Sequence, residues 1–443
     1  MVAKSEKPPS NNPIPSGSTV APKGMSAREE EASWKKPPAA PPPPKLDDYA
    51  SIVGAAAIRE LRTHAKVVRN KSIKMVNSTA VGGGVAEMLD RLVPLLNELE
   101  VKTTWDVISG GEDFFEVTKA FHNALQGGEY HLTPDAQETF LRYNEQNRQK
   151  MEFGEDLIVI HDPQPAALIQ GRKSSPGRWA WRCHIDLSSP NREVWEFLRP
   201  YIESYDASIF SSQAFTRQLP IPQYLFYPVI DPLSEKNKPL DDKAVQKVCD
   251  QFNIDRSRPI VSQVSRFDRA KDPVGVIQAF KLARQHVDCQ LLLAGGGATD
   301  DPEGAVVLKE VREAADDDPD IIILDLPPWC AHEINAFQRA STIVIQKSLR
   351  EGFGLTVTEA LWKAKPVIAS AVGGIPNQII DKLTGVLIHS VEGCAYQIRH
   401  LLQNPDFAAK LGQNGQEHVK ENFLITTDLR RWLLLLRVLL NLR

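Results

Sequence analysis

Two glutamates are the residues best placed to do chemistry, Glu351 and Glu359, with seven residues between them in LREGFGLTVTEALWKAKP. A helix is expected to begin after the GFG turn, and the unpaired N–H groups and positive dipole of a helix start favour anions. A diphosphate can therefore lie over residues 352–355, with Glu351 holding sugar hydroxyls and Glu359 holding a ribose diol. The pattern indicates a sugar-nucleotide site. The alternative is a solvated loop glutamate beside an ordinary surface glutamate.

A second candidate is the segment SRFDRAKDP, which places Arg266 and Lys271 five residues apart after a predicted strand. In a sugar transfer the departing nucleoside diphosphate gains negative charge, and fixed cations stabilise that charge better than mobile water does. The alternative is a solvated basic turn. The glycine-rich segments AGGG and AVGGIP also follow predicted strands and allow close approach of the backbone to a ligand. Four loops at one sheet edge are thus suited to an anion.

The N-terminal half offers weaker candidates at the ends of predicted strands. The segment VGGGVAE repeats the order strand, glycine loop, helix, so Gly83 and Gly84 can lie against phosphates or a second substrate. His161 in IVIHDPQP ends a strand and is expected to point at the cleft and touch sugar, although a structural histidine is the alternative. In WRCHIDLSSPN, His184 and Asp186 can bind hydroxyls of a second sugar or satisfy a buried loop.

Short apolar segments alternate with amphipathic helical patterns, which predicts parallel sheets covered by helices on both faces. A polar, proline-bearing break, DPLSEKNKPLDD, separates two such series. We predict an α/β protein of two Rossmann-like doubly wound domains that face each other across a cleft, with ligands at the carboxyl ends of the strands. The predicted strands are IKMVNS, DLIVIHDPQ, DASIFSS and YLFYPVI in the first domain and PIVSQVSRF, CQLLLAGGG, IIILDL, STIVIQ and KPVIAS in the second.

The domain boundaries follow from composition. Residues 1–46 hold eleven of the 32 prolines and few large apolar residues, so this tail is expected to be disordered. The first domain is predicted at 47–240 and the second at 241–420, with a C-terminal segment at 421–443. A chain of 443 residues is long enough for two such cores.

Composition excludes several classes of function. A net charge of −4 gives no basic footprint for nucleic acid. The five scattered cysteines fit reduced thiols in a cytoplasm, and no apolar segment is long enough to span a bilayer, so neither a nucleic-acid nor a membrane partner is expected. No metal site is expected, because no His/Cys cluster has zinc spacing and the acidic run Asp316–Asp318 is expected to be a solvated loop. The motifs GxSxG, GxxxxGK[ST] and HExxH are absent.

Taken together, these residues resemble the retaining glycosyltransferases of family four, which have the two-domain GT-B fold. The segment REGFGLTVTEALWKAKPVIASAVGGIP matches the donor-site signature of that family, and SRFDRAKDP matches its Arg and Lys pair. Further segments resemble the trehalose glycosyltransferring synthases of this family: VGGGVAEML, WDVISGGEDFFEVTKAFHNALQG, IHDPQPAAL, WRCHIDLSSPN, IDPLSEKN and HEINAFQRAS.

The resemblance implies transfer of glucose from a nucleoside diphosphate glucose to free glucose, giving α,α-trehalose. It implies retention without a protein nucleophile, and a C-terminal helix at 421–443 that crosses back to the first domain. By position, the implied catalytic residues are Arg266 and Lys271 as diphosphate cations, Glu351 on the donor glucose, and His161 near the reacting carbon. The implied substrate-binding residues are Gly83, Gly84, His184, Asp186, Gly352, Phe353, Gly354, Leu355 and the ribose ligand Glu359.

Two alternatives remain open at this point. A retaining trehalose phosphorylase, using glucose 1-phosphate and phosphate, resembles the same motifs. A catalytically silent nucleotide-sugar-binding module is the other. The expected partners are a nucleoside diphosphate glucose and glucose. No cofactor is expected to be obligatory, with Mg²⁺ at most stimulating, and the sequence leaves a homodimer open as well as the donor base.

Overall fold

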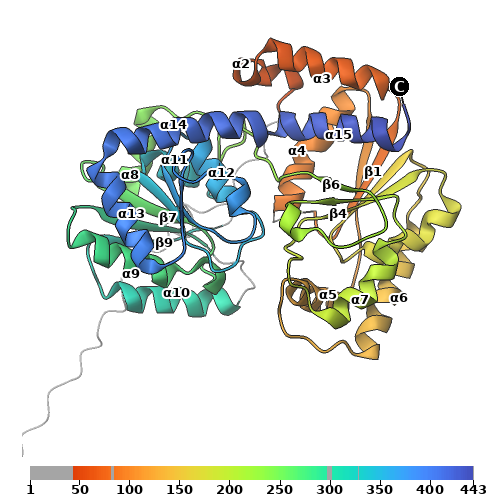
Figure 1. Cartoon of the computed structure of the whole chain (residues 1–443), viewed down its shortest axis with the longest axis horizontal. Helices are drawn as coiled ribbons and strands as arrows, with labels where there is room; N and C mark the ends of the chain where they lie inside the picture. Colours follow the sequence, from red (N-terminus) through yellow and green to blue (C-terminus); the bar gives the residue numbers. More distant parts are fainter. Residues whose placement is uncertain (1–42, 81–83, 297–301, 328, 443) are drawn as a thin grey trace, which may run out of the picture.

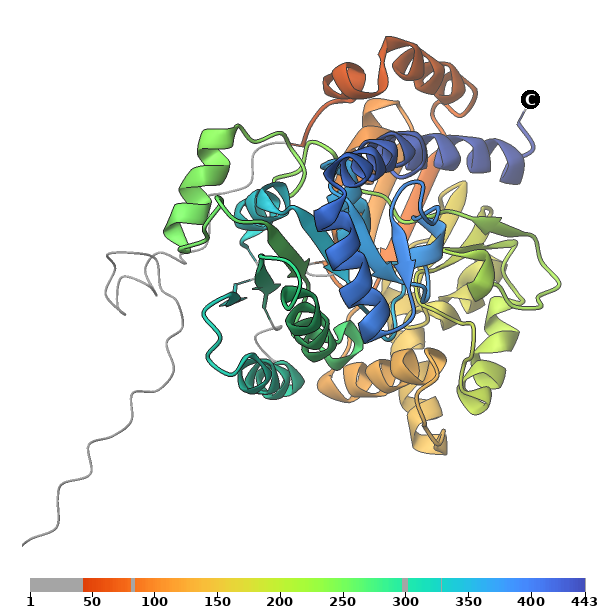
Figure 2. The same cartoon turned by 60° about the vertical axis from the view of Figure 1, so that its left-hand side comes forward.

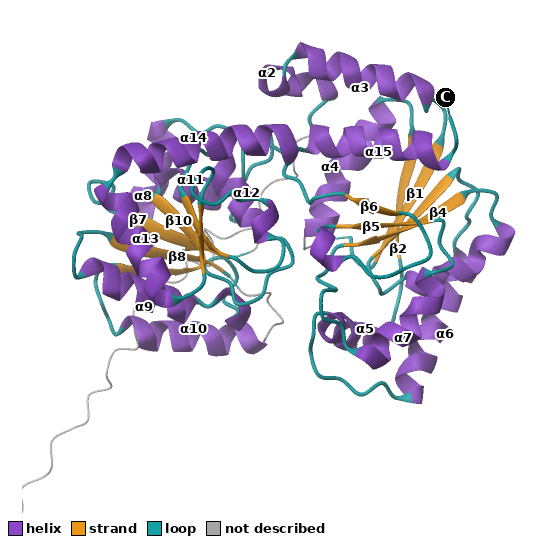
Figure 3. Ribbon diagram, in the orientation of Figure 1, coloured by secondary structure: helices purple, strands orange, loops and turns teal. Residues whose placement is uncertain are grey.

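The computed structural model describes residues 43–80, 84–296, 302–327 and 329–442. Two parallel sheets of six strands, each covered by helices, form its two halves (Figures 1 and 3). The α/β architecture predicted from the sequence is thus confirmed. Most of the predicted disordered tail and Gly83 lie outside the described residues. At the predicted end of the tail, Leu46 is fully buried and begins a 3₁₀ helix.

The first sheet has the strand order β2-β1-β3-β4-β5-β6, with every neighbouring pair parallel. The strand LIVIH is buried along its whole length, as expected for a parallel strand with helices on both faces. The strand order reverses between β1 and β3, which opens a crevice at their carboxyl ends. The strands are β1 (Ser72–Asn77), β2 (Lys102–Val107), β3 (Leu157–His161), β4 (Arg178–Cys183), β5 (Ala207–Phe210) and β6 (Gln223–Leu225).

The second sheet has the order β12-β11-β10-β7-β8-β9, again all parallel. Its order reverses between β7 and β10, so ligands are expected outside the carboxyl ends of these two strands. The strands are β7 (Ile260–Val264), β8 (Gln290–Gly295), β9 (Ile321–Asp325), β10 (Ile343–Gln346), β11 (Val367–Ser370) and β12 (Val386–Ile388).

Helices cover both sheets (Figure 3). In the first half they are α2 (Ala50–Val53), α3 (Ala55–Val67), α4 (Gly84–Glu98), α5 (Glu112–Leu125), α6 (Pro134–Lys150) and α7 (Arg192–Ile202), with the 3₁₀ helices η1 (Leu46–Tyr49), η2 (Ala166–Ser174) and η3 (Gln213–Phe215). In the second they are α8 (Asp242–Gln251), α9 (Pro273–Arg284), α10 (Pro302–Ala315), α11 (Ala331–Ala340), α12 (Leu355–Trp362), α13 (Val391–Gln403) and α14 (Pro405–Asn422), with η4 (Arg269–Lys271) and η5 (Ile375–Asn377). No helix among the described residues is both long and apolar enough to cross a membrane.

The last helix, α15 (Ile425–Leu439), returns to the first half and packs on α3 and α4, and both views place it beside α3 (Figures 1 and 2). The chain passes between the halves twice, and the two crossings are tied together. Ile230 N–H donates to the carbonyl of Phe423 at 2.9 Å, and Ile425 N–H donates to the carbonyl of Ile230 at 2.9 Å. The two sheets are therefore joined by a paired connection.

Trp432 anchors α15 in the core of the first half. It is fully buried, its ring meets Phe226 edge-on with centroids 5.3 Å apart, and its indole N–H donates to Asp428 at 3.0 Å. The guanidinium of Arg182, on β4, lies 5.5 Å from the same ring. Asp428 and Arg182 are both buried, and the Arg182 charge opposes the rise that burial causes in the Asp428 pKa.

Candidate functional site

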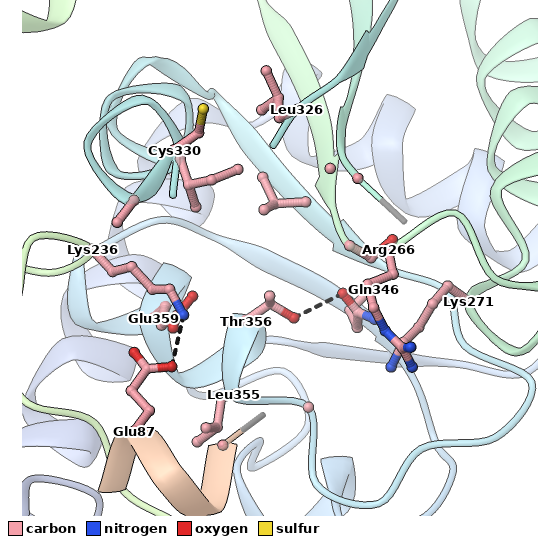
Figure 4. A pocket seen from close by; sticks show the side chains of 18 of the residues that line it. Glu87, Lys236, Arg266, Lys271, Leu326, Cys330, Gln346, Leu355, Thr356 and Glu359 are labelled. Atoms are coloured by element: carbon pink, nitrogen blue, oxygen red, sulfur yellow. Dashed lines mark hydrogen bonds and ion pairs between the residues drawn. The ribbon is translucent and has the colours of Figure 1, made fainter. Parts of the chain in front are cut away.

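A cavity of about 880 Å³ lies between the two halves, at the carboxyl ends of their strands. Its wall includes Gly84 and Glu87 from α4, Arg266 and Lys271 after β7, and Glu351 after β10. Figure 4 shows these parts of the chain around a common space. The cavity thus lies at the crevice that the reversal of strand order between β7 and β10 creates.

Lys271 and Glu351 form an ion pair on the wall of this cavity. The Lys271 Nζ lies 2.6 Å from Glu351 Oε2, and the side chains are 18% and 8% exposed. The same Oε2 accepts hydrogen bonds from Gln346 Nε2 at 3.3 Å and from Ser348 Oγ at 3.1 Å. Both residues were predicted as site residues. The structure places them side by side, so that a cation suited to phosphate lies next to a carboxylate that can accept hydrogen bonds from a sugar hydroxyl.

Arg266 is the more exposed of the two predicted cations, with a side chain that is 59% exposed and 3.2 Å from Asp268. Figure 4 shows its guanidinium pointing toward the same part of the cavity as the Lys271 ammonium. The loop after β7 therefore brings both predicted cations to one region.

The start of α12 forms another part of the wall. Its N-cap is Gly354, which has a φ of 82°, and both Gly354 and Leu355 line the cavity. Phe353 turns the other way, into the core beside Tyr227 and Phe423. Any role of Phe353 in binding is therefore confined to its backbone. The Gly352 carbonyl accepts a hydrogen bond from the N–H of Gly374 at 3.0 Å.

Glu359 also lines the cavity, from the second turn of α12, and is 5% exposed. Burial raises the pKa of its carboxyl group, and the charges of Lys236 and Lys363 oppose that rise. Lys363 donates to Asn237 Oδ1 at 3.0 Å, whereas Lys236 lines the cavity and pairs with Glu87 at 2.9 Å. Lys236 and Glu87 were not singled out from the sequence, although Lys236 falls in the segment IDPLSEKN.

His161 does not point at the cleft as predicted. It is fully buried, and its Nδ1 lies 2.9 Å from His184 Nε2, with the two rings stacked 5.2 Å apart. Burial lowers the pKa of both imidazoles, as does the nearby charge of Arg182. Neither ring is on the described cavity wall. The physical reason is that the His184 imidazole provides a hydrogen-bond partner for His161 Nδ1 inside the protein. The His161 Nε2 atom has no hydrogen-bond partner among the described residues.

Of the remaining predicted residues, Gly84 lines the cavity and Asp186 and Gly352 do not. Gly84 begins α4 on the cavity wall, and a Cβ built on it would lie 3.4 Å from Leu355 Cδ1 across the cleft. Asp186 accepts a hydrogen bond from the N–H of Ser188 at 2.7 Å, and neither it nor Gly352 is on the described wall. The structure therefore gathers Arg266, Lys271, Glu351 and Glu359, and leaves Asp186 in a local turn.

Comparisons with known proteins agree with this geometry. Residues 75–217 match the family model "Trehalose synthase, N-terminal domain", and residues 246–418 match "Glycosyl transferases group 1". The chain is 44% identical over 399 residues to the trehalose synthase of Thermococcus litoralis, covering 88% of this chain and 96% of that one. This chain belongs to the trehalose synthase family. The family resemblance seen in the sequence is confirmed, and the chain is a glycosyltransferase of trehalose metabolism.

This chain is also similar to a trehalose phosphorylase and to a solved trehalose-6-phosphate synthase structure. The trehalose phosphorylase of Pleurotus pulmonarius is 29% identical over 450 residues, covering 88% of this chain and 60% of that one. The solved structure of the trehalose-6-phosphate synthase OtsA superposes with a TM-score of 0.67 at 15% identity, covering 83% of this chain and 99% of that chain. The second similarity shows the GT-B fold.

In this member of the trehalose synthase family, the loop AVGGIP packs behind the loop that carries Glu351. Gly373 has a φ of 54°, and a Cβ built on it would lie 1.6 Å from the carbonyl oxygen of Glu351. We expect Gly373→Ala to displace Glu351, lowering kcat at least tenfold and stability by about 1–3 kcal/mol. Gly54→Ala is the matched control, since Gly54 has a φ of 85° but nothing within 4 Å of its Cβ position. A wild-type kcat for Gly373→Ala would contradict this role.

Gln263 connects the loop after β7 to the loop after β10. It is buried on β7, donates from Nε2 to the carbonyl of Lys271 at 3.0 Å, and accepts from the N–H of Lys347 at 3.1 Å. Its replacement leaves two buried backbone groups unpaired, at about 1–3 kcal/mol each. We expect Gln263→Leu to lower both thermal stability and kcat, the latter about tenfold.

A buried glutamine elsewhere provides the control for Gln263. Gln290, on the neighbouring strand β8, donates to the carbonyls of Asp255 and Arg258 and does not line the cavity. Gln290→Leu should reduce stability by a similar amount and leave the kcat of the folded protein unchanged. Equal kcat losses in the two variants would show that the loss at Gln263 is a general effect of destabilisation.

Proposed function

We propose that this chain transfers glucose from a nucleoside diphosphate glucose to free glucose, with retention, and so forms α,α-trehalose. The observation that carries the proposal is the Lys271–Glu351 pair, 2.6 Å apart at the carboxyl ends of β7 and β10, in a cavity that both domains line. The similarity to a trehalose synthase over nearly the whole of that relative supports the choice of product.

The proposed chemistry is stabilisation of the leaving group. Arg266, Lys271 and the N–H groups at the start of α12 would hold the diphosphate, where negative charge accumulates as the bond to the anomeric carbon breaks. A hydroxyl of the acceptor glucose would attack that carbon on the face from which the diphosphate departs. Its proton would pass to the departing phosphate oxygen, so that configuration is retained without a protein nucleophile. Interactions that strengthen as this charge develops lower the barrier selectively.

Two other residues would position the substrates. Glu351, with Lys271 beside it, would accept hydrogen bonds from hydroxyls of the donor glucose. Glu359 would accept hydrogen bonds from the ribose diol, since it lines the same cavity from the second turn of α12.

No metal is required for this proposal. Arg266 and Lys271 would supply the positive charge that a divalent ion supplies to a leaving diphosphate elsewhere. We therefore expect turnover to persist after dialysis against EDTA, with Mg²⁺ at most stimulating it. Complete and Mg²⁺-reversible loss of turnover would contradict this part of the proposal.

Product analysis by NMR tests the proposed reaction directly. Purified protein is given UDP-, ADP- or GDP-glucose together with glucose, and the anomeric signals are followed with time. We expect α,α-trehalose and nucleoside diphosphate to appear in equal amounts with at least one donor. A β-linked product would overturn retention, and the most active nucleotide would identify the donor base.

A trehalose phosphorylase is the second candidate, favoured by the 29% identity to the Pleurotus pulmonarius enzyme. A cluster of cations that holds a diphosphate can also hold inorganic phosphate. Phosphate-dependent cleavage of trehalose without any use of nucleotide-glucose would establish this candidate instead. Binding of nucleotide-glucose without turnover over a broad panel of acceptors would indicate a silent binding module.

A further inference from the structure

Lys236 lies where three parts of the chain meet. It belongs to the segment that connects the two domains, and its Nζ pairs with Glu87 Oε2 on α4 of the first domain at 2.9 Å. The same ammonium group shares the cavity wall with Glu359, which comes from α12 of the second domain, and the two charges act on each other (Figure 4). One lysine thus faces carboxylates of both domains on the cavity wall.

The two lysines near Glu359 differ in their surroundings. Lys363 is 6% exposed, does not line the cavity, and is held by Asn237 and by the Glu359 carbonyl at 3.1 Å. Lys236 lines the cavity, with a side chain that is 33% exposed. Burial lowers the pKa of Lys236, but the charges of Glu359 and Glu87 outweigh burial and raise it. Lys236 therefore stays charged on the side of Glu359 that a ligand approaches.

Glu359 can bind a diol well only as a carboxylate. An ionised carboxylate accepts two hydrogen bonds, whereas a protonated one has lost part of that capacity. Burial favours the protonated form of Glu359, so a charge that opposes protonation is part of its function. Lys236 supplies such a charge, and Glu87 fixes the position of Lys236 from the opposite domain.

We propose that Lys236 is a positioning residue that keeps the Glu359 carboxylate in place to recognise the ribose diol of the donor, with Glu87 as its anchor across the cleft. This inference rests on the proposed function, since it needs a nucleotide in the cavity. Recognition of the ribose in the second domain then depends on a residue of the first domain. Domain contact and nucleotide binding are coupled through one ion pair.

The test compares ribonucleotides with 2′-deoxyribonucleotides by calorimetry. The probes are UDP, 2′-deoxy-UDP, ADP and 2′-deoxy-ADP, and the measured quantity is the ratio of the deoxy to the ribo Kd. Hydrogen bonds to a charged group predict a ratio of about tenfold or more in the wild-type protein. In Lys236→Met this ratio should fall several-fold, because binding of the ribonucleotide weakens and binding of the deoxynucleotide does not. Glu87→Gln should change the ratio in the same direction by less.

Lys238→Met is the matched control. Lys238 lies two residues away, pairs with Glu235 at 2.7 Å, and does not line the cavity. The ratio of the deoxy to the ribo Kd measured for Lys238→Met should equal that of the wild-type protein. Thermal melts of all variants, including Glu87→Gln, establish that each is folded.

Three outcomes would overturn the inference. Equal weakening of ribo and deoxy binding in Lys236→Met would mean that Lys236 only attracts phosphate. An unchanged ratio of deoxy to ribo Kd in Lys236→Met would mean that Lys236 has no role in ribose recognition. A ratio near one in the wild-type protein would mean that the protein does not contact the ribose hydroxyl at all. In each of these cases nucleotide binding, and with it the proposed function, still stands. If the wild-type protein binds none of the four nucleotides, the proposed donor fails together with this inference.

Discussion

Replacing Lys271 by alanine is expected to lower kcat about 10²–10³-fold while the KM for glucose changes little. The reason is that Lys271 is the more buried of the two cations at the proposed diphosphate site, with a side chain 18% exposed against 59% for Arg266. A charge in a partly buried site acts more strongly on developing negative charge than one in water. Steady-state kinetics with the best nucleotide-glucose donor, varying glucose, would measure both constants.

The partner of Lys271 makes a sharper test possible. Glu351 would keep its hydrogen bonds to Gln346 and Ser348 in Lys271→Ala, so its unpaired carboxylate could by itself repel a diphosphate. The double variant Lys271→Met, Glu351→Gln removes that repulsion. If Lys271 stabilises the leaving group, kcat stays low in the double variant. Recovery of kcat would mean that Lys271 serves only to neutralise Glu351.

A neighbouring arginine supplies the control. Arg269 lies on the same 3₁₀ turn, pairs with Glu310 at 2.6 Å, and does not line the cavity. Because an exposed ion pair contributes little to stability, Arg269→Ala should keep the wild-type kcat. Equal losses in kcat and in the affinity for glucose in Lys271→Ala would contradict the leaving-group role.

The fold could be predicted where strands are mostly apolar. The segments that became β3, β7, β8 and β10 are buried along their whole length, and hydrophobic runs of this kind indicate parallel strands directly. Three strands were missed. β2 is an edge strand with an exposed first residue and half-buried polar positions, and β12 has only three residues.

The third missed strand, β4, shows a different limit. Its sequence RWAWRC contains two arginines, which argue against a buried strand, yet Arg182 is 1% exposed. Its charge lies close to that of Asp428, which comes from the last helix. The local sequence around Arg182 does not show that a distant segment supplies the opposite charge. The predicted strand YLFYPVI was only partly right, since Tyr224 and Leu225 join the sheet in β6 and the remainder, which pairs with Leu424 at Ile230, forms the connection between domains.

The candidate site shows the same division between local and distant information. Arg266, Lys271, Glu351 and Glu359 follow strands or begin a helix, so their shared sheet edge could be predicted from order along the chain. The ion pair between Lys271 and Glu351 could not, because it depends on how two loops meet. The contact of Glu87 with Lys236 depends on the arrangement of the domains. The burial of His161 was not predicted because its partner His184, which follows β4, is distant in the sequence.

The second large effect is expected on stability, from Trp432→Ala. Trp432 is fully buried where α15 packs on the first domain, and truncation of such a residue costs about 3–5 kcal/mol. The substitution also leaves Asp428 without the indole N–H and Arg182 without the ring beneath it. A domain of this size should lose roughly 6–20 °C in Tm. Circular dichroism during a thermal or urea titration would measure the change.

Two further variants determine the cause of that loss. Trp432→Phe keeps most of the apolar volume and loses the hydrogen bond to Asp428, so it should lie between the wild-type protein and Trp432→Ala. Trp329 is 42% exposed, and Trp329→Ala should change stability by less than about 1 kcal/mol. If Trp432→Ala were no less stable than Trp329→Ala, α15 would not anchor the first domain. Because α14 and α15 run from the second domain to the first, loosening this anchor should also lower kcat/KM, since the cavity needs residues from both.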